Sequence, residues 1–331
     1  MKLNFGILCR TLTEDGGLFD MRSAKLGGRR PFGVVASLML IASTLAAAPA
    51  TGQELEPREP RAYRTLPVGL NYILFTYIYS SGNVVTEPAA PLQDLDLDLS
   101  IVTVSYLRSL GLFGRSSSFT ISVPYGFISG SGRFQGELVE DSRSGAAATR
   151  MRLAVNLLGG PAMTPKEYAE FGQRRNLGVS LTLVPPSGQY DTTRFVNFGT
   201  NRWAFKPEIG YSSVRGRWIL DAALGVWLFT TNDNYVGLTR EQDPIGSFQG
   251  HLSYNFKPGL WLALDANYYT GGRTTLGGDE KSDLQRNSRV GVTLALPLKP
   301  RHSLRLAAET GAFTSIGADF DRLRIAYLYR W

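Results

Sequence analysis

The last residues of the chain alternate between apolar and polar side chains, a pattern that few folds can use. Every second position from 323 to 331 is large and apolar, and the positions between are mostly cationic or small: Leu323, Ile325, Tyr327, Tyr329 and Trp331 against Arg322, Arg324, Ala326, Leu328 and Arg330. A repeat of two predicts a β-strand. Chain termini usually fray, but the last strand of a closed barrel must pair with the first to remove both sheet edges. The pattern therefore favours a closing strand, with the edge strand of a soluble β-sandwich as the alternative.

Segments of about ten residues with alternating character continue through the chain, and a tilted strand of this length crosses a bilayer. In 247–257, for example, Leu252 and Tyr254 suit lipid, and His251 and Ser253 suit water. The sequence thus predicts an all-β fold, an antiparallel transmembrane β-barrel of about 12 strands. We place the strands at 69–79, 97–108, 117–128, 149–158, 176–185, 203–213, 217–229, 247–257, 260–270, 287–298, 303–313 and 322–331.

The connections between these segments alternate between short and long. Short turns such as 214–216 and 258–259 alternate along the chain with long polar or Gly-rich stretches such as 186–202 and 230–246. Outer-membrane barrels show this asymmetry, with short periplasmic turns and long extracellular loops. An even strand number then places both termini in the periplasm. One turn, 159–175, is long, and Pro165 to Phe171 within it could form a small helix.

The N-terminal region has the form of a secretory signal peptide. A basic stretch with Arg29 and Arg30 precedes an apolar, Ala-rich run from Phe32 to Ala48. We interpret residues 1–52 as this signal peptide with an over-extended start, the true start being Met21, and a retained membrane anchor is the alternative. Residues 53–67 are then an irregular periplasmic lead-in, and residues 68–331 the barrel. The only cysteine, Cys9, lies in the removed part, so the mature chain has no thiol.

Export and a barrel fold together predict a location in the bacterial outer membrane. The aromatic C-terminus, with Tyr327, Tyr329 and Trp331, resembles the signal by which such barrels are recognised for assembly. We therefore expect outer-membrane lipids and the barrel-assembly machinery as partners, and a monomer. Residues 1–52 hold six Lys or Arg and three Asp or Glu, so their removal lowers the net charge from +7 to +4. This excess is too small, and too scattered, to indicate a nucleic-acid partner.

Charged and polar residues occupy the inward positions of the predicted strands. Such charges cost several kcal/mol unless they are paired or hydrated. They leave two interpretations open: a water-filled pore that selects solutes, or a lumen closed by a network of ion pairs. The candidate lumen-lining residues are Arg150, Arg152, Asn156, Lys206, Glu208, Asp221, His251, Asp265, Arg289, Arg305, Glu309 and Arg324.

One pair of residues raises the alternative of an enzyme. His251 and Ser253 lie two apart on one strand, as in the outer-membrane phospholipase barrel, whose reaction requires them on the lipid side. Here the alternation turns both toward the lumen, and no third residue that would orient the histidine is evident in the sequence. We therefore expect no enzymatic activity, no catalytic residues, no cofactor and no metal site.

Several motifs resemble an outer-membrane barrel family labelled "putative MetA-pathway of phenol degradation". They lie at Glu59–Tyr63, Pro186–Asp191, Asn197–Glu208, Thr239–Pro244 and Gly259–Asp265. The resemblance implies an outer-membrane channel or transporter for passive uptake or efflux of small aromatic or hydrophobic molecules, and it assigns no site residues. The alternative is a structural or adhesive barrel with a plugged lumen, whose extracellular loops bind a partner.

Overall fold

The computed structural model describes residues 59–86, 92–134, 136–194 and 196–331. The predicted signal peptide, with Cys9 and Met21, lies outside the described residues, as does the start of the predicted lead-in.

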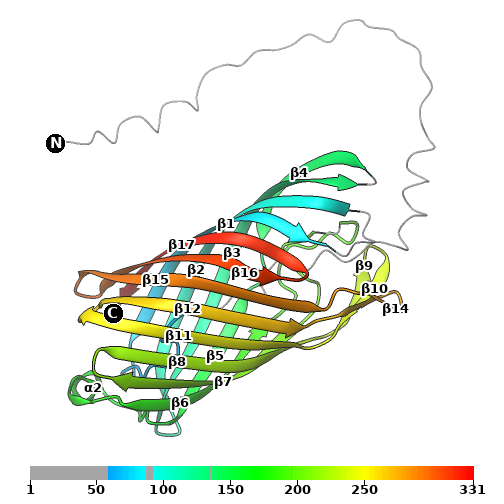
Figure 1. Cartoon of the computed structure of the whole chain (residues 1–331). Coiled ribbons are helices and arrows are strands. Elements are labelled where there is room, and N and C mark those ends of the chain that lie inside the picture. The colour runs from blue at the N-terminus through cyan, green and yellow to red at the C-terminus, as the bar shows by residue number, and fades with distance from the viewer. Residues whose placement is uncertain (1–58, 87–91, 135, 195) are drawn as a thin grey trace, which may run out of the picture. The chain divides into compact units, whose positions relative to one another are not determined.

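Twelve antiparallel strands form a closed barrel, which confirms the predicted fold (Figure 1). Around the ring, each strand pairs with its neighbours, and the circle closes because β2 pairs with both β1 and β3. The barrel strands are β1 Asn71–Val85, β2 Leu92–Leu112, β3 Arg115–Phe134, β5 Arg150–Leu158, β6 Arg175–Val184, β7 Ala204–Arg215, β8 Trp218–Phe229, β11 Ile245–Lys257, β12 Leu260–Gly271, β15 Gln285–Lys299, β16 His302–Thr314 and β17 Gly317–Arg330.

The first and last strands close the barrel, as the C-terminal pattern predicted. The register between β1 and β17 runs from Tyr72 opposite Arg330 to Val85 opposite Gly317. At the very end, the backbone N–H and C=O groups of Asn71 and Trp331 exchange two hydrogen bonds of 3.0 Å. The terminal residue of the chain therefore takes part in the pairing of β1 with β17, which we call the seam of the barrel.

The two faces of the wall differ in polarity, because strand side chains alternate in direction. On β11, Leu252 is 39% exposed on the outer face, and its neighbour Ser253 is 0% exposed on the inner face. The outer face is rich in large apolar side chains from every part of the ring, among them Phe75, Val104, Leu153, Ile209, Leu224, Leu264, Val292 and Ile325. Such an outer face is suited to lipid.

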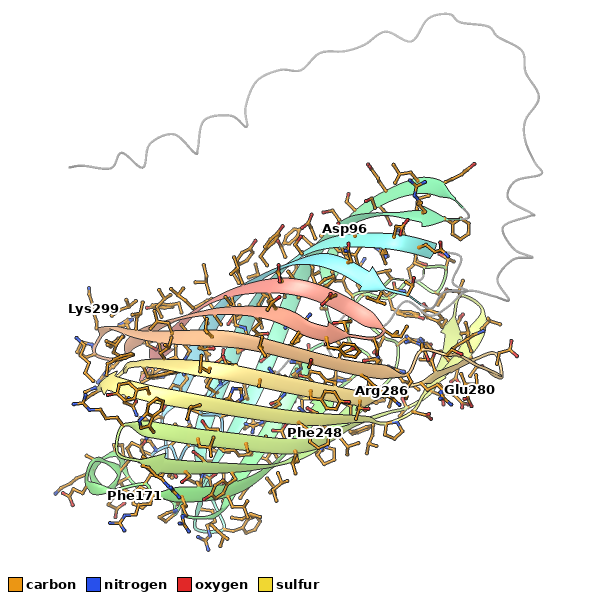
Figure 2. All side chains as sticks on the ribbon, viewed as in Figure 1. Asp96, Phe171, Phe248, Glu280, Arg286 and Lys299 are labelled. Carbon is orange, nitrogen blue, oxygen red and sulfur yellow. The ribbon has the colours of Figure 1, made fainter. Side chains whose placement is uncertain are left out.

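The barrel has a short-turn end and a long-loop end. The short-turn end carries tight turns with positive-φ glycines, for example Gly216 (φ 58°) and Gly259 (φ 81°), which need the left-handed conformation. Figure 2 shows Phe171 and Lys299 at this end, and Glu280 and Arg286 at the other. Helix α2, Pro165–Glu170, lies in the one long connection at the short-turn end, close to the predicted position. In the described part of the chain, the helices are too short or too polar to span a membrane.

Several strands extend further at the long-loop end than predicted, and some of the long connections there contain further strands. The sequence-based boundaries end at 79 and 128, but β1 continues to Val85 and β3 to Phe134, where β4 (Glu137–Ala146) pairs with it. Two further loops contain the strands β9 Asn232–Tyr235, β10 Leu238–Gln242, β13 Thr274–Leu276 and β14 Asp279–Glu280, which form a separate four-stranded sheet.

This extension was missed because its polarity is reversed. In β2, Leu95 and Leu97 are buried on the inner side, and Asp96 and Asp98 are exposed on the outer side. A strand that leaves the bilayer meets water on its outer face, so an apolar outer row is no longer expected there.

Candidate functional site: the barrel lumen

A segment that precedes β1 lies inside the barrel and follows its inner wall. We call residues 59–67 the inner segment. Near β1, the backbone of Leu66 exchanges hydrogen bonds with the Ser116 hydroxyl of β3. Further toward the N-terminus, the Arg61 guanidinium donates to Asn255 of β11 at 3.0 Å and lies 4.0 Å from the ring centre of Trp261 of β12. At its start, Glu59 pairs with Arg305 of β16. The described part of the predicted lead-in forms turns and no helix or strand, and these contacts hold it against strands around the lumen.

Tyr63 anchors this segment in the wall. Its hydroxyl donates to Glu208 at 2.7 Å and lies 3.0 Å from Ser180, and the side chain is only 4% exposed. The ring lies against Gly178 and Gly210, which are directly opposite each other in β6 and β7. A Cβ atom on Gly210 would lie 2.0 Å from the ring, so the two glycines form a slot that admits it.

An apolar cluster occupies the lumen nearer the long-loop end. Phe198, from the connection between β6 and β7, is 9% exposed and packs with Ile78, Leu97, Ile128 and Phe320 from four strands. Its neighbour Asn197 ties the loop together, since its side chain accepts from the backbone N–H of Asp191 at 2.9 Å and donates to the Asp191 carbonyl at 3.0 Å. The hydroxyl and the backbone N–H of Thr193 donate to the Asp191 carboxylate at 2.6 and 2.9 Å, and these bonds lower the pKa of Asp191.

A cavity of about 380 Å³ lies within the lumen. Its wall includes the inner segment together with residues of β1, β2, β3, β5, β16 and β17. Its lining combines apolar side chains such as Leu74 and Ile101 with hydroxyl groups such as Ser105 and Thr120. Eight of the lining residues are arginine or lysine. Among the described residues, one acidic residue, Glu59, lines the cavity as well.

Ion pairs join several of the inward charges. Lys206 Nζ lies 2.7 Å from Glu208 Oε2, and both side chains are almost fully buried. Across β16 and β17, Arg324 lies 3.0 Å and Arg322 3.7 Å from Glu309. In a low-dielectric interior such pairing offsets much of the desolvation cost of each charge.

His251 also has a carboxylate partner, which corrects one expectation from the sequence. Its Nδ1 lies 2.7 Å from Asp265 Oδ1, and Thr293 donates to Asp265 Oδ2 at 2.6 Å. The third residue that orients the histidine thus comes from the neighbouring strand β12. His251 and Ser253 are 6% and 0% exposed on the inner side and do not line the cavity, so this group lacks the lipid-facing access that an ester hydrolase of the phospholipase type requires.

The structure divides the twelve candidate lumen residues into two sets. Those that line the cavity are Arg150, Arg152, Asn156, Lys206, Arg305 and Arg324. Those that are buried on the inner side but do not line it are Glu208, Asp221, His251, Asp265, Arg289 and Glu309. A role for either set in solute selection stays a prediction. Sequence reasoning missed Tyr63 and Arg61, although a glycine at an inward position of a strand is a signal for a close neighbour.

Comparisons with known proteins find a family model and similar solved structures. A family model described as "Putative MetA-pathway of phenol degradation" matches residues 78–313. Among solved structures, an outer membrane channel from Pseudomonas putida F1 is similar over 83% of this chain and 100% of its own, with 20% identity and a TM-score of 0.72. The β domain of a Bordetella autotransporter is similar over 79% of this chain and 99% of its own, with 12% identity and a TM-score of 0.48.

The first of these structures shows a shared barrel fold. A search of the curated proteins finds no match. The family match covers most of the chain and confirms the resemblance expected from its motifs. The chain belongs to the family "Putative MetA-pathway of phenol degradation".

Proposed function

We propose that the protein is a passive outer-membrane channel for small aromatic or hydrophobic molecules. The observation that carries the proposal is the cavity inside a closed barrel whose outer face is apolar. Apolar side chains from two neighbouring strands, among them Leu74, Ile78, Leu99 and Ile101, contribute to its lining. The family membership supports the same substrate class.

The proposed channel acts as a monomer and needs no cofactor or energy source. Its outer face contacts outer-membrane lipids, and the barrel-assembly machinery inserts it. Two bands of aromatic side chains support the membrane setting, since such rings prefer the two membrane interfaces. Trp218 and Tyr254 (ring centres 4.8 Å apart) lie near the short-turn end, and Phe248 and Tyr268 (6.1 Å) near the long-loop end.

Reconstitution of the refolded protein in planar bilayers and in liposomes tests this function. We expect small single-channel currents in the bilayers, and uptake of small aromatic solutes into the liposomes above the rate of protein-free vesicles. Absence of both current and solute flux in protein that is correctly folded would refute transport.

A second candidate function is a structural or adhesive barrel whose lumen is plugged. Its support is the obstruction of the lumen by the inner segment and by Phe198, together with the ordered sheet of β9, β10, β13 and β14 at the long-loop end. Deletion of Thr231 to Pro244 separates the two functions. If the protein is an adhesive barrel, the deletion abolishes binding to its partner and leaves any solute flux unaffected. If the protein is a channel, solute uptake is observed both before and after the deletion.

A further inference from the structure

Cationic side chains gather on the outside of the barrel at the short-turn end. Six of them are exposed at or next to the tight turns and the connection that contains α2: Arg108 of β2, Arg175 of β6, Arg215 of β7, Arg217 in the turn that follows β7, Lys257 of β11 and Lys299 of β15. We call these six residues the cationic belt. Figure 2 shows its member Lys299 at this end of the barrel.

The register of the sheet places members of the belt on the lipid-facing side of the wall. Residues directly opposite each other on paired strands share a face of the sheet. Arg108 lies opposite Phe119, and Arg215 lies opposite Trp218. The rings of Phe119 and Trp218 are 37% and 50% exposed on the outer face. The two arginines therefore share the face that contacts lipid and do not share the face that lines the lumen.

Aromatic rings lie beside the belt, on the side toward the middle of the barrel. Trp218 and Tyr254 have ring centres 4.8 Å apart, and the Arg217 guanidinium lies 3.5 Å from the Tyr254 hydroxyl. Lys257 follows the exposed ring of Phe256. Aromatic rings prefer the membrane interface, and long cationic side chains extend past the apolar region to the headgroups. The belt thus lies at the depth where phosphate groups of lipids are expected.

Negative charges of the protein do not balance the belt. Among the described residues of the turns at this end, the acidic ones are Glu167 and Glu170 of α2, and the terminal carboxylate of Trp331 adds one charge. No ion pair between described residues includes a member of the belt. At the long-loop end the outer face differs, because Asp98 and Asp321 are exposed there.

We propose that the cationic belt binds the headgroups of anionic phospholipids in the leaflet at the short-turn end. Guanidinium and ammonium groups donate strong hydrogen bonds to phosphate oxygens, and cations beside a membrane are attracted to an anionic leaflet. Arg175, Arg215, Arg217 and Lys257 come from β6, β7, the turn between β7 and β8, and β11, which are neighbours in the ring, so one lipid can contact more than one of them. The inference rests on the membrane setting of the proposed function and not on transport.

Quenching of tryptophan fluorescence by brominated phospholipids measures the lipid preference beside the belt. Trp203, Trp218 and Trp331 are exposed, whereas Trp227 and Trp261 are buried. In a reporter protein with Trp203→Phe and Trp331→Phe, the exposed tryptophan that remains is Trp218, opposite Arg215. In mixed vesicles at low salt, brominated phosphatidylglycerol should bind there about fivefold more strongly than brominated phosphatidylcholine. The preference should decrease at high salt, because screening weakens the attraction.

Variants of the reporter protein show whether the belt causes the preference. Replacing three members near Trp218, with Arg215→Gln, Arg217→Gln and Lys257→Gln, should reduce the preference to near unity. Arg215→Lys with Arg217→Lys should retain most of it, because the charges remain. Each variant is first checked for the heat-modifiable gel shift of a folded barrel.

A matched control removes the same number of charges at the long-loop end. Arg133→Gln, Arg194→Gln and Arg273→Gln replace arginines that pair with described carboxylates, those of Asp94, Asp141 and Glu280. This variant has the same net charge as the triple variant of the belt, but its belt is intact. It should keep the preference for phosphatidylglycerol.

Three results would overturn the proposal: equal quenching by the two brominated lipids in the reporter protein, an unchanged preference in the triple variant of the belt, or an equal loss of preference in the control variant. Conductance in planar bilayers separates this inference from the channel function. If the lipid preference is present and the protein conducts no ions or solutes, the belt stands and the channel function fails. If the protein conducts and the preference is absent, the channel function stands and the belt fails.

Discussion

At the scale of single residues, the strongest constraint in the lumen is the burial of Lys206 and Glu208. Their side chains are 3% and 1% exposed, and the charged atoms are 2.7 Å apart. Glu208 also accepts the hydroxyl of Tyr63 at 2.7 Å, so the carboxylate joins the wall to the inner segment. Desolvation of two ions costs about as much as their attraction returns, so such a pair adds little net stability, yet breaking it is costly.

A set of variants at this pair measures that asymmetry. Glu208→Gln retains an acceptor for Tyr63 but removes the carboxylate that lies 2.7 Å from the ammonium of Lys206, and should destabilise the barrel by about 3–5 kcal/mol. Adding Lys206→Met should restore most of the loss, because both members of the buried ion pair are then replaced. Urea unfolding of protein folded in lipid vesicles gives both values. This account would be contradicted if Glu208→Gln were as stable as the wild type, or if Glu208→Gln with Lys206→Met were less stable than Glu208→Gln alone.

Alternation in the sequence predicted on which side of the barrel wall these side chains lie, but not which residues they contact. The period of two placed Lys206, Glu208, His251 and Ser253 on the inner side, where the structure has them. The partner of His251 could not be predicted, because it depends on the register that brings Asp265 of β12 opposite it. Register is set by the pairing of whole strands, and no local pattern in the sequence reveals it.

At the scale of elements, the inner segment is the feature that sequence reasoning missed. The segment has no periodicity, contains Pro60 and Pro67, and precedes the first strand, so it has the composition of a linker. Its order comes from specific contacts with distant strands, such as the bond from Asn176 to the carbonyl of Tyr63. The glycines at 178 and 210, each at an inward position of a predicted strand, were the available signal, because an inward glycine often marks a close neighbour.

Substitution of one of these glycines should release the segment. In Gly210→Ala the new methyl group would lie 2.0 Å from the ring of Tyr63, so the ring must leave its slot. We expect a larger single-channel conductance than in the wild type, since the segment crosses the lumen. Tyr63→Ala should have the same effect by removing the anchor itself.

Gly250→Ala is the matched control for the glycine substitution. Gly250 is also in a barrel strand, but a Cβ atom there has no neighbour within 4 Å. The effect of alanine on strand propensity is therefore tested without a clash. If Gly210→Ala and Gly250→Ala both leave the conductance at the wild-type value, the inner segment does not limit the channel.

At the scale of the whole molecule, strand number and closure were predictable and orientation in the membrane is still a prediction. Twelve alternating segments and the contrast between turns and loops were sufficient for the barrel. The small sheet at the long-loop end was not predicted, because its strands are only two to five residues long, too short for a clear period.

Cysteine labelling tests the orientation. Asn234 is exposed at the long-loop end and Pro258 is exposed in a short turn, and the mature chain is predicted to lack cysteine. An impermeant maleimide should label Asn234→Cys on intact cells, and should label Pro258→Cys only after the outer membrane is permeabilised. The reverse result would place the long loops in the periplasm and invert the predicted topology.

Closure of the ring makes the last three residues more important than those of an ordinary terminus. Trp331 exchanges backbone hydrogen bonds with Asn71, and its ring lies 5.6 Å from that of Tyr329 at the short-turn end. Without these residues the start of β1 loses partners at the seam, and each unsatisfied backbone group in hydrocarbon costs several kcal/mol. The aromatic end that we predict to serve as the assembly signal is lost at the same time.

Removal of Tyr329 to Trp331 should therefore abolish membrane insertion, whereas a frayed terminus of a soluble protein would change stability by only about 1 kcal/mol or less. Arg330→Ala is the control, because it keeps the backbone of the seam and both aromatic rings and should assemble normally. The measurement is the heat-modifiable gel shift of folded barrel in the outer-membrane fraction. A truncated protein that shows this shift at the wild-type level would mean that the seam tolerates open backbone groups there, and that assembly does not depend on the terminal aromatic residues.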